Sequence, residues 1–400
     1  MGNFLNFIYD EVDVTKEGII TYMHSYLGIE DYRVFDINNI PNDNEKYYYF
    51  FEYRYYLASY LVSEKKLPFS DTVLNLLKNN PNFNLILSND AESDDDILIE
   101  ALDVVFKNMG IDTNKIVVIN CNEKNNEIKN RLNTNIITHS TNNGKFAYSN
   151  EFSRWPYDYK EKRDFLFMTY NRHVKIHRFA LLVKLMKYNI IDNTDWTWVR
   201  GYEVRQNFLQ SGIDLSESWY LKPLFNIEEI KEYEKEIMDL SYVHKKKSIY
   251  EANYEFDFPP FGFDAAVAYS NNPYSNSYIN IVTETNFDKE DIILPSEKSY
   301  VPLYFSQIPI IMASSHHIKK MKELHGFDFF DDVINHDYDN ELNYKKRFNM
   351  IIDEVIRLNS KKDDIEYFFK HNKERFDNNR KIVVEMKKDK KDYNFYNSLR

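Results

Sequence analysis

The sequence predicts an α/β protein made of two Rossmann-like domains that face a cleft, followed by a helical segment at the C-terminus. Three observations favour this fold class. The chain has 400 residues, which is more than one hydrophobic core usually serves. Two successive stretches follow a strand–helix–strand pattern, which is typical of βαβ units and parallel sheets. Between them, near residue 150, begins the polar, proline-containing stretch SNEFSRWPYDYKEKRD.

The first unit starts with residues 1–80, which are helix-leaning and rich in Tyr and Phe. Its run KYYYFFEYRYYLASYLV at 46–62 favours a buried aromatic helix or a pair of strands. An amphipathic helix is expected from about Ile97 to Met109, with Gly110 at its C-cap. The short apolar runs expected as strands are NLILS at 84–88, KIVVIN at 115–120 and NIITH at 135–139.

The second unit repeats this alternation from about residue 164. Its expected strands are DFLFMTY at 164–170, WTWVR at 196–200, YINIVTET at 278–285 and IPIIMA at 308–313. Its expected helices are HRFALLVKLMKY at 177–188, a segment at about 227–240, SYVPLYFSQ at 299–307, a helix ending at Gly326, residues 340–358 and most of 361–388. We therefore expect domains over 1–160 and 161–356 and a helical tail over 357–400.

Glycine and cysteine are scarce, and this excludes several classes of site. The chain has nine glycines, no two close enough for a G-x-G-x-x-G fingerprint, a P-loop or a G-x-S-x-G elbow. A bound phosphate must therefore be held by side chains and helix N-termini. The single cysteine, Cys121, excludes an internal disulfide and every C-x-x-C zinc site.

Charge and hydropathy indicate the binding partners and the cellular compartment of the chain. The net charge of −12 disfavours broad electrostatic binding to nucleic acid. No apolar run is long enough to span a membrane, and the acidic N-terminal segment does not resemble a signal peptide. With one cysteine, these features predict a cytoplasmic protein. The heavy use of Asn, Tyr, Ile, Lys and Asp suggests an AT-rich genome, and a viral protein of this kind would lie in the host cytoplasm.

The segment NRHVKIHR at 171–178 follows an expected strand and opens an expected helix. Its basic residues are Arg172, His173, Lys175, His177 and Arg178. Cations at a helix N-terminus are unfavourable with the helix dipole unless an anion binds there. A solvated basic turn is one interpretation. A phosphate clamp is the other, because the planar arginine fork can hold two phosphate oxygens.

A second group of residues, PSEKSY at 295–300, opens the next helix. Ser296 has the pattern of an N-cap, and Glu297 and Lys298 fall in the first turn. There a carboxylate can accept hydrogen bonds from ribose hydroxyls, and the lysine can neutralise a diphosphate. Taken alone, a Glu-Lys pair at this position is most often ordinary surface charge.

Together these motifs resemble a group of viral and bacterial glycosyltransferase-like proteins whose second half is similar to the α1,3-fucosyltransferases. The resemblance covers roughly 164–356. The matching residues are Asn171, Arg172, His177, Arg178, Val282, Thr283, Glu284, Thr285, Phe287, Ser296, Glu297, Lys298, Pro302, Pro309, Gly326, Phe327, Phe330, Asp332, Tyr338 and Asp339. The chain departs from the group at His336, where a glutamate is usual, and the first 160 residues align with no string of the group.

The resemblance implies a GT-B fold whose second domain holds a nucleotide-diphosphate sugar and whose first domain binds the acceptor. It implies that Arg178 and Lys298 bind the diphosphate and that Glu297 binds the ribose. Glu284 should face the donor or the transferred sugar. Asn171 and Arg172 belong to the same predicted donor site.

The catalytic base of an inverting transfer should come from the first domain. Asp90 and Glu92, just after the strand at 84–88, are the candidates. Asp94 to Asp96 suit the first turn of the following helix instead. An acidic D-x-D triad belongs to the single-domain GT-A class, so no metal or other cofactor is expected here. The histidines show no metal-ligand spacing.

Two functions follow. The first is a glycosyltransferase that uses a nucleotide-diphosphate sugar and an unidentified acceptor, whether a glycan, a protein, a small molecule or a hydroxylated DNA base. The alternative is a non-catalytic nucleotide- or glycan-binding or structural protein, associated with a virion, that keeps the fold. A nucleic-acid-binding module is the weakest interpretation, because of the net charge.

Overall fold

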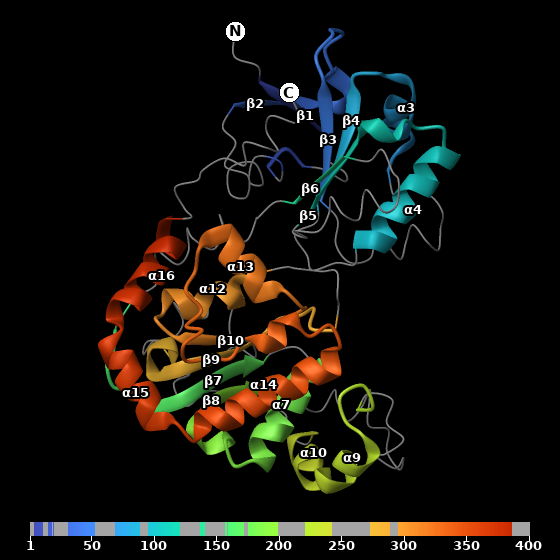
Figure 1. Cartoon of the computed structure of the whole chain (residues 1–400). Helices are drawn as coiled ribbons and strands as arrows, with labels where there is room; N and C mark the ends of the chain where they lie inside the picture. The colour runs from blue at the N-terminus through green and yellow to red at the C-terminus, as the bar shows by residue number, and fades with distance from the viewer. Residues whose placement is uncertain are drawn as a thin grey trace, which may run out of the picture. The chain divides into compact units, whose positions relative to one another are not determined.

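A computed structural model gives the structure of the chain (Figure 1). It describes residues 4–10, 15–17, 19, 31–52, 69–88, 95–120, 137–140, 157, 159–171, 175–198, 221–241, 273–288 and 295–385. The chain divides into two compact units at Ala147 and Tyr148, and the second unit extends to Glu385. The expected boundary was 160/161. The helices expected as a separate tail after 356 belong, up to Glu385, to the second unit.

The first unit contains a six-stranded sheet in which every pairing is parallel. The spatial order is β2-β1-β3-β4-β5-β6. The strands are β1 (Leu5–Tyr9), β2 (Tyr32–Asp36), β3 (Tyr47–Glu52), β4 (Phe83–Ser88), β5 (Ile116–Asn120) and β6 (Ile137–Ser140), with helices α3 (Asp71–Asn79) and α4 (Asp95–Asn108). The predictions of a strand near 84–88, a helix near 97–109 and a strand near 115–120 are confirmed.

The helix-leaning prediction for residues 1–80 is wrong for much of the described part, because β1, β2 and β3 lie there. The aromatic run begins with β3, in the middle of the sheet, where Tyr47 and Tyr49 are at most 1% exposed. A central parallel strand is buried on both faces, so it lacks the alternation that identifies a strand in sequence. The Tyr49 ring packs against Phe69 and Phe83, at centroid distances of 5.9 and 6.3 Å.

The second unit contains a four-stranded parallel sheet in the order β10-β9-β7-β8. The strands are β7 (Phe165–Asn171), β8 (Thr194–Trp198), β9 (Ser277–Thr283) and β10 (Ile308–Met312). The helices are α7 (Ile176–Lys187), α9 (Ile227–Glu232), α10 (Glu234–Ser241), α12 (Glu297–Tyr304), α13 (His317–His325), α14 (Tyr344–Asn359), α15 (Lys362–His371) and α16 (Lys373–Glu385). Each strand expected in this unit is present within a few residues of its predicted position.

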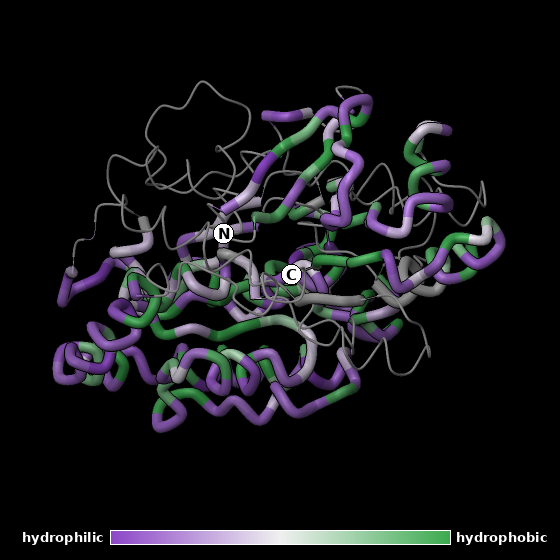
Figure 2. The backbone as a smooth tube through the Cα atoms, turned by 90° about the horizontal axis from the view of Figure 1, so that it is seen from above, coloured by the Kyte–Doolittle hydropathy of each residue, from purple (hydrophilic) through white to green (hydrophobic). Residues whose placement is uncertain are grey.

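Helices cover both faces of this sheet (Figure 1). Helix α14 packs on α7 and β10 on one side, while α12 packs on β9, β10 and α16 on the other. The four strands consist mostly of buried residues, and hydrophobic and hydrophilic residues alternate along the described backbone (Figure 2). The chain is therefore an α/β protein with two parallel sheets. In the described part of the chain, no helix is both long and apolar enough to span a membrane.

The strand order locates a topological switch in the second unit. From β7 the chain first adds β8 on one side, and then returns to add β9 on the other side. The connections after β7 and β9 therefore leave the sheet in opposite directions. In open parallel sheets, ligands bind outside the carboxyl ends of the two strands at such a switch.

Candidate functional site

Two helix N-termini meet at the carboxyl ends of β7 and β9. From the first turn of α7, His177 Nε2 lies 2.8 Å from the carbonyl oxygen of Glu284, and Arg178 Nη2 donates to the carbonyl oxygen of Thr283 at 2.9 Å. From the N-cap of α12, the Ser296 hydroxyl donates to the Glu284 carboxylate. Glu284 directly follows β9, so one residue contacts both helix starts.

Among the residues that the structure describes, none provides the N-terminus of α7 with a side-chain cap. Its N-cap residue, Lys175, makes no side-chain capping bond, and the first turn contains no acidic residue. Helix α9 shows the contrast, because Asn226 and Glu229 form a complete capping box there. Uncapped amide groups and first-turn cations together favour binding of an anion. This is the arrangement that the phosphate-clamp interpretation of the basic segment requires.

Arg178 and His177 are both buried, with 3% of each residue exposed. Burial, together with the neighbouring Arg178 charge, lowers the pKa of His177 well below its usual value. His177 is therefore neutral at neutral pH. Because a carbonyl oxygen can only accept, the Nε2 atom carries the proton and donates it to Glu284. The positive charge of this turn comes from Arg178 and Lys175.

The Glu284 carboxylate is 3% exposed and accepts from three donor groups. Ser296 provides its backbone NH at 3.2 Å and its hydroxyl at 2.9 and 2.7 Å, and the Ser299 hydroxyl donates at 2.6 Å. These bonds attach the end of β9 to the first turn of α12. In this structure the carboxylate is turned to the protein interior, and its predicted contact with a donor stays a prediction.

Lys298 is the half-buried cation of the α12 N-terminus. Its backbone NH and its Nζ atom each donate to the Ser296 hydroxyl oxygen at 3.2 Å. The N-cap position predicted for Ser296 is confirmed. Glu297 is the first residue of α12, but its side chain lies outside the described part of the structure.

Asn171 ends β7 and is 1% exposed. Its Oδ1 atom accepts from the Thr283 hydroxyl at 2.8 Å, and its Nδ2 atom donates to the Thr169 hydroxyl at 3.1 Å. The side chain therefore ties the ends of β7 and β9 together. Three other predicted site residues, Arg172, Asp90 and Glu92, lie outside the described residues.

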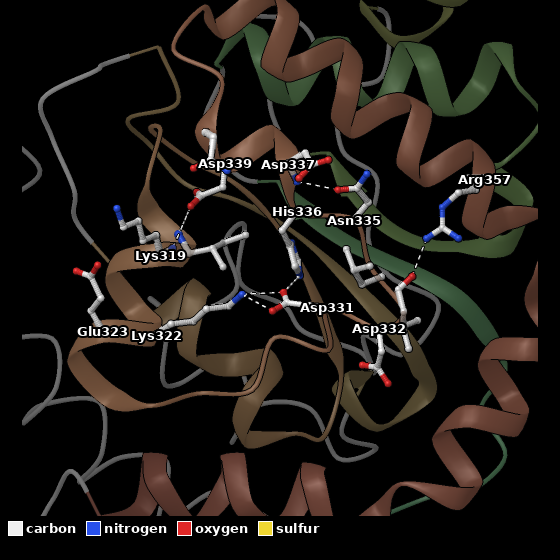
Figure 3. A pocket seen from close by; sticks show the side chains of 14 residues that line it. Lys319, Lys322, Glu323, Asp331, Asp332, Asn335, His336, Asp337, Asp339 and Arg357 are labelled. Carbon is white, nitrogen blue, oxygen red and sulfur yellow. Dashed lines mark hydrogen bonds and ion pairs between the residues drawn. The ribbon is translucent and has the colours of Figure 1, made fainter.

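A separate cavity of about 680 Å³ lies between α13, the segment 331–340 and Arg357 of α14 (Figure 3). Its charged lining residues are Lys319, Lys322, Arg357, Glu323, Asp331, Asp332, Asp337 and Asp339. These carboxylates outnumber the cations, so the cavity disfavours a diphosphate. Asp331 is also paired with Lys322 at 2.7 Å.

His336, where the glycosyltransferase-like group usually has glutamate, forms part of the wall of this cavity. Its Nε2 atom lies 2.9 Å from the Phe329 carbonyl oxygen, and its Nδ1 atom lies 3.0 Å from the Tyr338 hydroxyl. Burial lowers its pKa, so it is neutral at neutral pH. Tyr338 in turn accepts from the backbone NH of Ile311 in the edge strand β10, at 3.3 Å. Tyr338 therefore connects the histidine to the edge strand.

Ser299 and His317 were not singled out in the sequence, although both contact the site. The Ser299 hydroxyl lies 3.1 Å from His317 Nε2. The S-x-x-S spacing of Ser296 and Ser299 at the start of a helix was a usable signal for the first. For the second, only its place just after a buried strand could have drawn attention.

Among the residues that the structure describes, no three His, Cys, Asp or Glu side chains form a group that could hold a metal ion. The chain matches no protein-family model, and no curated protein or solved structure is significantly similar to it. Function must therefore be argued from the site itself.

Proposed function

We propose that the protein is a glycosyltransferase and that the switch between β7 and β9 binds its nucleotide-diphosphate sugar. One observation carries the proposal. The cationic α7 N-terminus, which has no side-chain cap from the described residues, and the α12 N-terminus with Lys298 both contact Glu284 at the carboxyl end of β9. Together they supply positive charge and amide groups without a glycine-rich loop or a metal.

In the proposed reaction, the oxygen of an acceptor hydroxyl attacks the anomeric carbon of the donor sugar. The bond between that carbon and the diphosphate oxygen breaks, and the nucleotide diphosphate leaves with the electron pair. Arg178, Lys298 and the two helix dipoles stabilise the negative charge that develops on the leaving group. A carboxylate takes the hydroxyl proton, and Asp90 and Glu92 remain the proposed bases. The transfer is inverting and independent of metal.

The first test is binding. Nucleotide diphosphates of several bases are screened for an increase in melting temperature, and stabilising ones are then offered as sugar donors in a hydrolysis and transfer assay. Stabilisation followed by release of the diphosphate supports the proposal. If no diphosphate stabilises the chain, the non-catalytic structural protein becomes the better interpretation.

The Lys298→Ala variant tests the residue assignment. Loss of one charge-assisted contact should weaken diphosphate binding by roughly 1.5–3 kcal/mol, while affinity for the free nucleoside stays unchanged. Lys345→Ala is a matched control, because Lys345 is likewise the second residue of its helix and half-buried. Equal losses for diphosphate and nucleoside would mean that Lys298 has a structural role, contrary to the proposal.

A further inference from the structure

A series of buried hydrogen bonds links three side chains at the first turn of α12. It consists of Glu284, Ser299 and His317, which are 3%, 0% and 1% exposed. The Ser299 hydroxyl lies 2.6 Å from Glu284 Oε1 and 3.1 Å from His317 Nε2. This hydrogen-bond series thus connects the residues that follow β9 and β10 with the helix between these strands.

The chemistry of the groups sets the direction of each hydrogen bond. An ionised carboxylate only accepts, so the one hydroxyl proton of Ser299 goes to Glu284. The Ser299 oxygen must then accept from His317, whose Nε2 atom carries the proton. Burial lowers the pKa of His317 to about 4, so the ring is neutral and can take this role. His317 therefore donates to Ser299, and Ser299 donates to Glu284.

Both ends of this hydrogen-bond series are attached to the start of a helix. At one end, Glu284 accepts from the Ser296 hydroxyl, and the Ser296 hydroxyl oxygen in turn accepts from Lys298 Nζ at 3.2 Å. At the other end, the Asp339 carboxylate accepts from the backbone NH groups of Ile318 and Lys319 at 3.0 Å each. This capping fixes the first turn of α13, and therefore the position of His317.

We propose that Glu284, Ser299 and His317 are positioning residues, which hold the first turn of α12 so that Lys298 can bind the donor diphosphate, an inference that rests on the proposed function. Hydrogen bonds to Ser296 and to one another occupy their polar atoms, which favours a supporting role over direct contact with a ligand. Their place argues for control of Lys298, because the Ser296 hydroxyl accepts from its ammonium group and donates to the Glu284 carboxylate. A buried acceptor that fixes a ligating side chain typically changes affinity when it is removed.

The test measures inorganic pyrophosphate binding by calorimetry, using the full chain. Ser299→Ala removes the shared hydroxyl and should raise the dissociation constant for pyrophosphate by roughly three- to tenfold, the usual net value of one hydrogen bond. Ser299→Thr, which keeps a hydroxyl, should restore most of the affinity. Ser277→Ala is the control, because this serine is also 0% exposed and lies at the opposite end of β9, where its hydroxyl makes no hydrogen bond to the described residues.

A double-mutant cycle separates positioning from general loss of stability. If Ser299 acts through Lys298, the Ser299→Ala change should have no further effect in a Lys298→Ala chain. His317→Gln provides a second variant in case Ser299→Ala does not fold, and the same non-additivity is expected. Equal effects of Ser299→Ala with and without Lys298, or no effect at all, would overturn the inference alone. A wild-type chain without affinity for pyrophosphate would overturn the proposed function and this inference with it.

Discussion

Acidification should destabilise the second unit, and His317 should account for a measurable part of the effect. Burial lowers the pKa of His317 from 6.5 to about 4 in the folded chain. The unfolded chain therefore binds more protons than the folded chain between these values, and stability falls as the pH falls through this window. Well above pH 6.5 the ring is neutral in both states and contributes no pH dependence. At pH 5 the expected loss from this one group is about 2 kcal/mol.

The assay is urea unfolding at pH 7.5 and pH 5, followed by tryptophan fluorescence. All four tryptophans lie in the sequence range of the second unit, and Trp198 is fully buried against Phe179. His317→Gln should reduce the difference in unfolding free energy between the two pH values by about 2 kcal/mol. The pH dependence that remains comes from carboxylates and the other buried histidines. His371→Gln is the control, because His371 is exposed. Identical pH dependence in wild type and His317→Gln would refute the reasoning.

Three further predictions concern the reaction. Transfer activity should survive EDTA, because Arg178, Lys298 and the helix N-termini supply the charge that Mg²⁺ provides in other sites; a complete loss that added metal reverses would contradict this. Replacing the true base by its amide, in Glu92→Gln or Asp90→Asn, should leave donor affinity intact and lower turnover by roughly 10²–10⁴. Glu297→Gln should instead weaken donor binding. Full turnover in both first-domain variants would exclude this loop as the source of the base.

The order of strands and helices along the chain could be predicted from local pattern. Short apolar runs such as IPIIMA and KIVVIN are buried in the structure as β10 and β5. The restart of the pattern after residue 160 correctly indicated a second sheet. The pattern failed in the first 80 residues, because tyrosine and phenylalanine fill central strands there and leave no alternation.

The basic segment and the Ser296 cap could also be found in sequence, since each is a local feature of a helix start. The partners of these residues could not. His177 and Arg178 contact Glu284 and Thr283 across more than 100 positions of sequence. Which strands become neighbours depends on the packing of whole sheets, and no local periodicity records it.

Glu284 shows most clearly what tertiary structure decided. Its motif predicts a residue that faces a donor, and the structure adds what the motif does not record, namely that the hydroxyls of Ser296 and Ser299 donate to its carboxylate. The sequence by itself determined a protein of two parallel α/β units, without a glycine-rich phosphate loop and with cations at two helix starts. Tertiary structure decided that these two starts meet at one strand end, because β9 lies beside β7 while β8 takes the other side. A buried carboxylate must also find donors nearby, so packing made Glu284 the residue that joins β9 to α12.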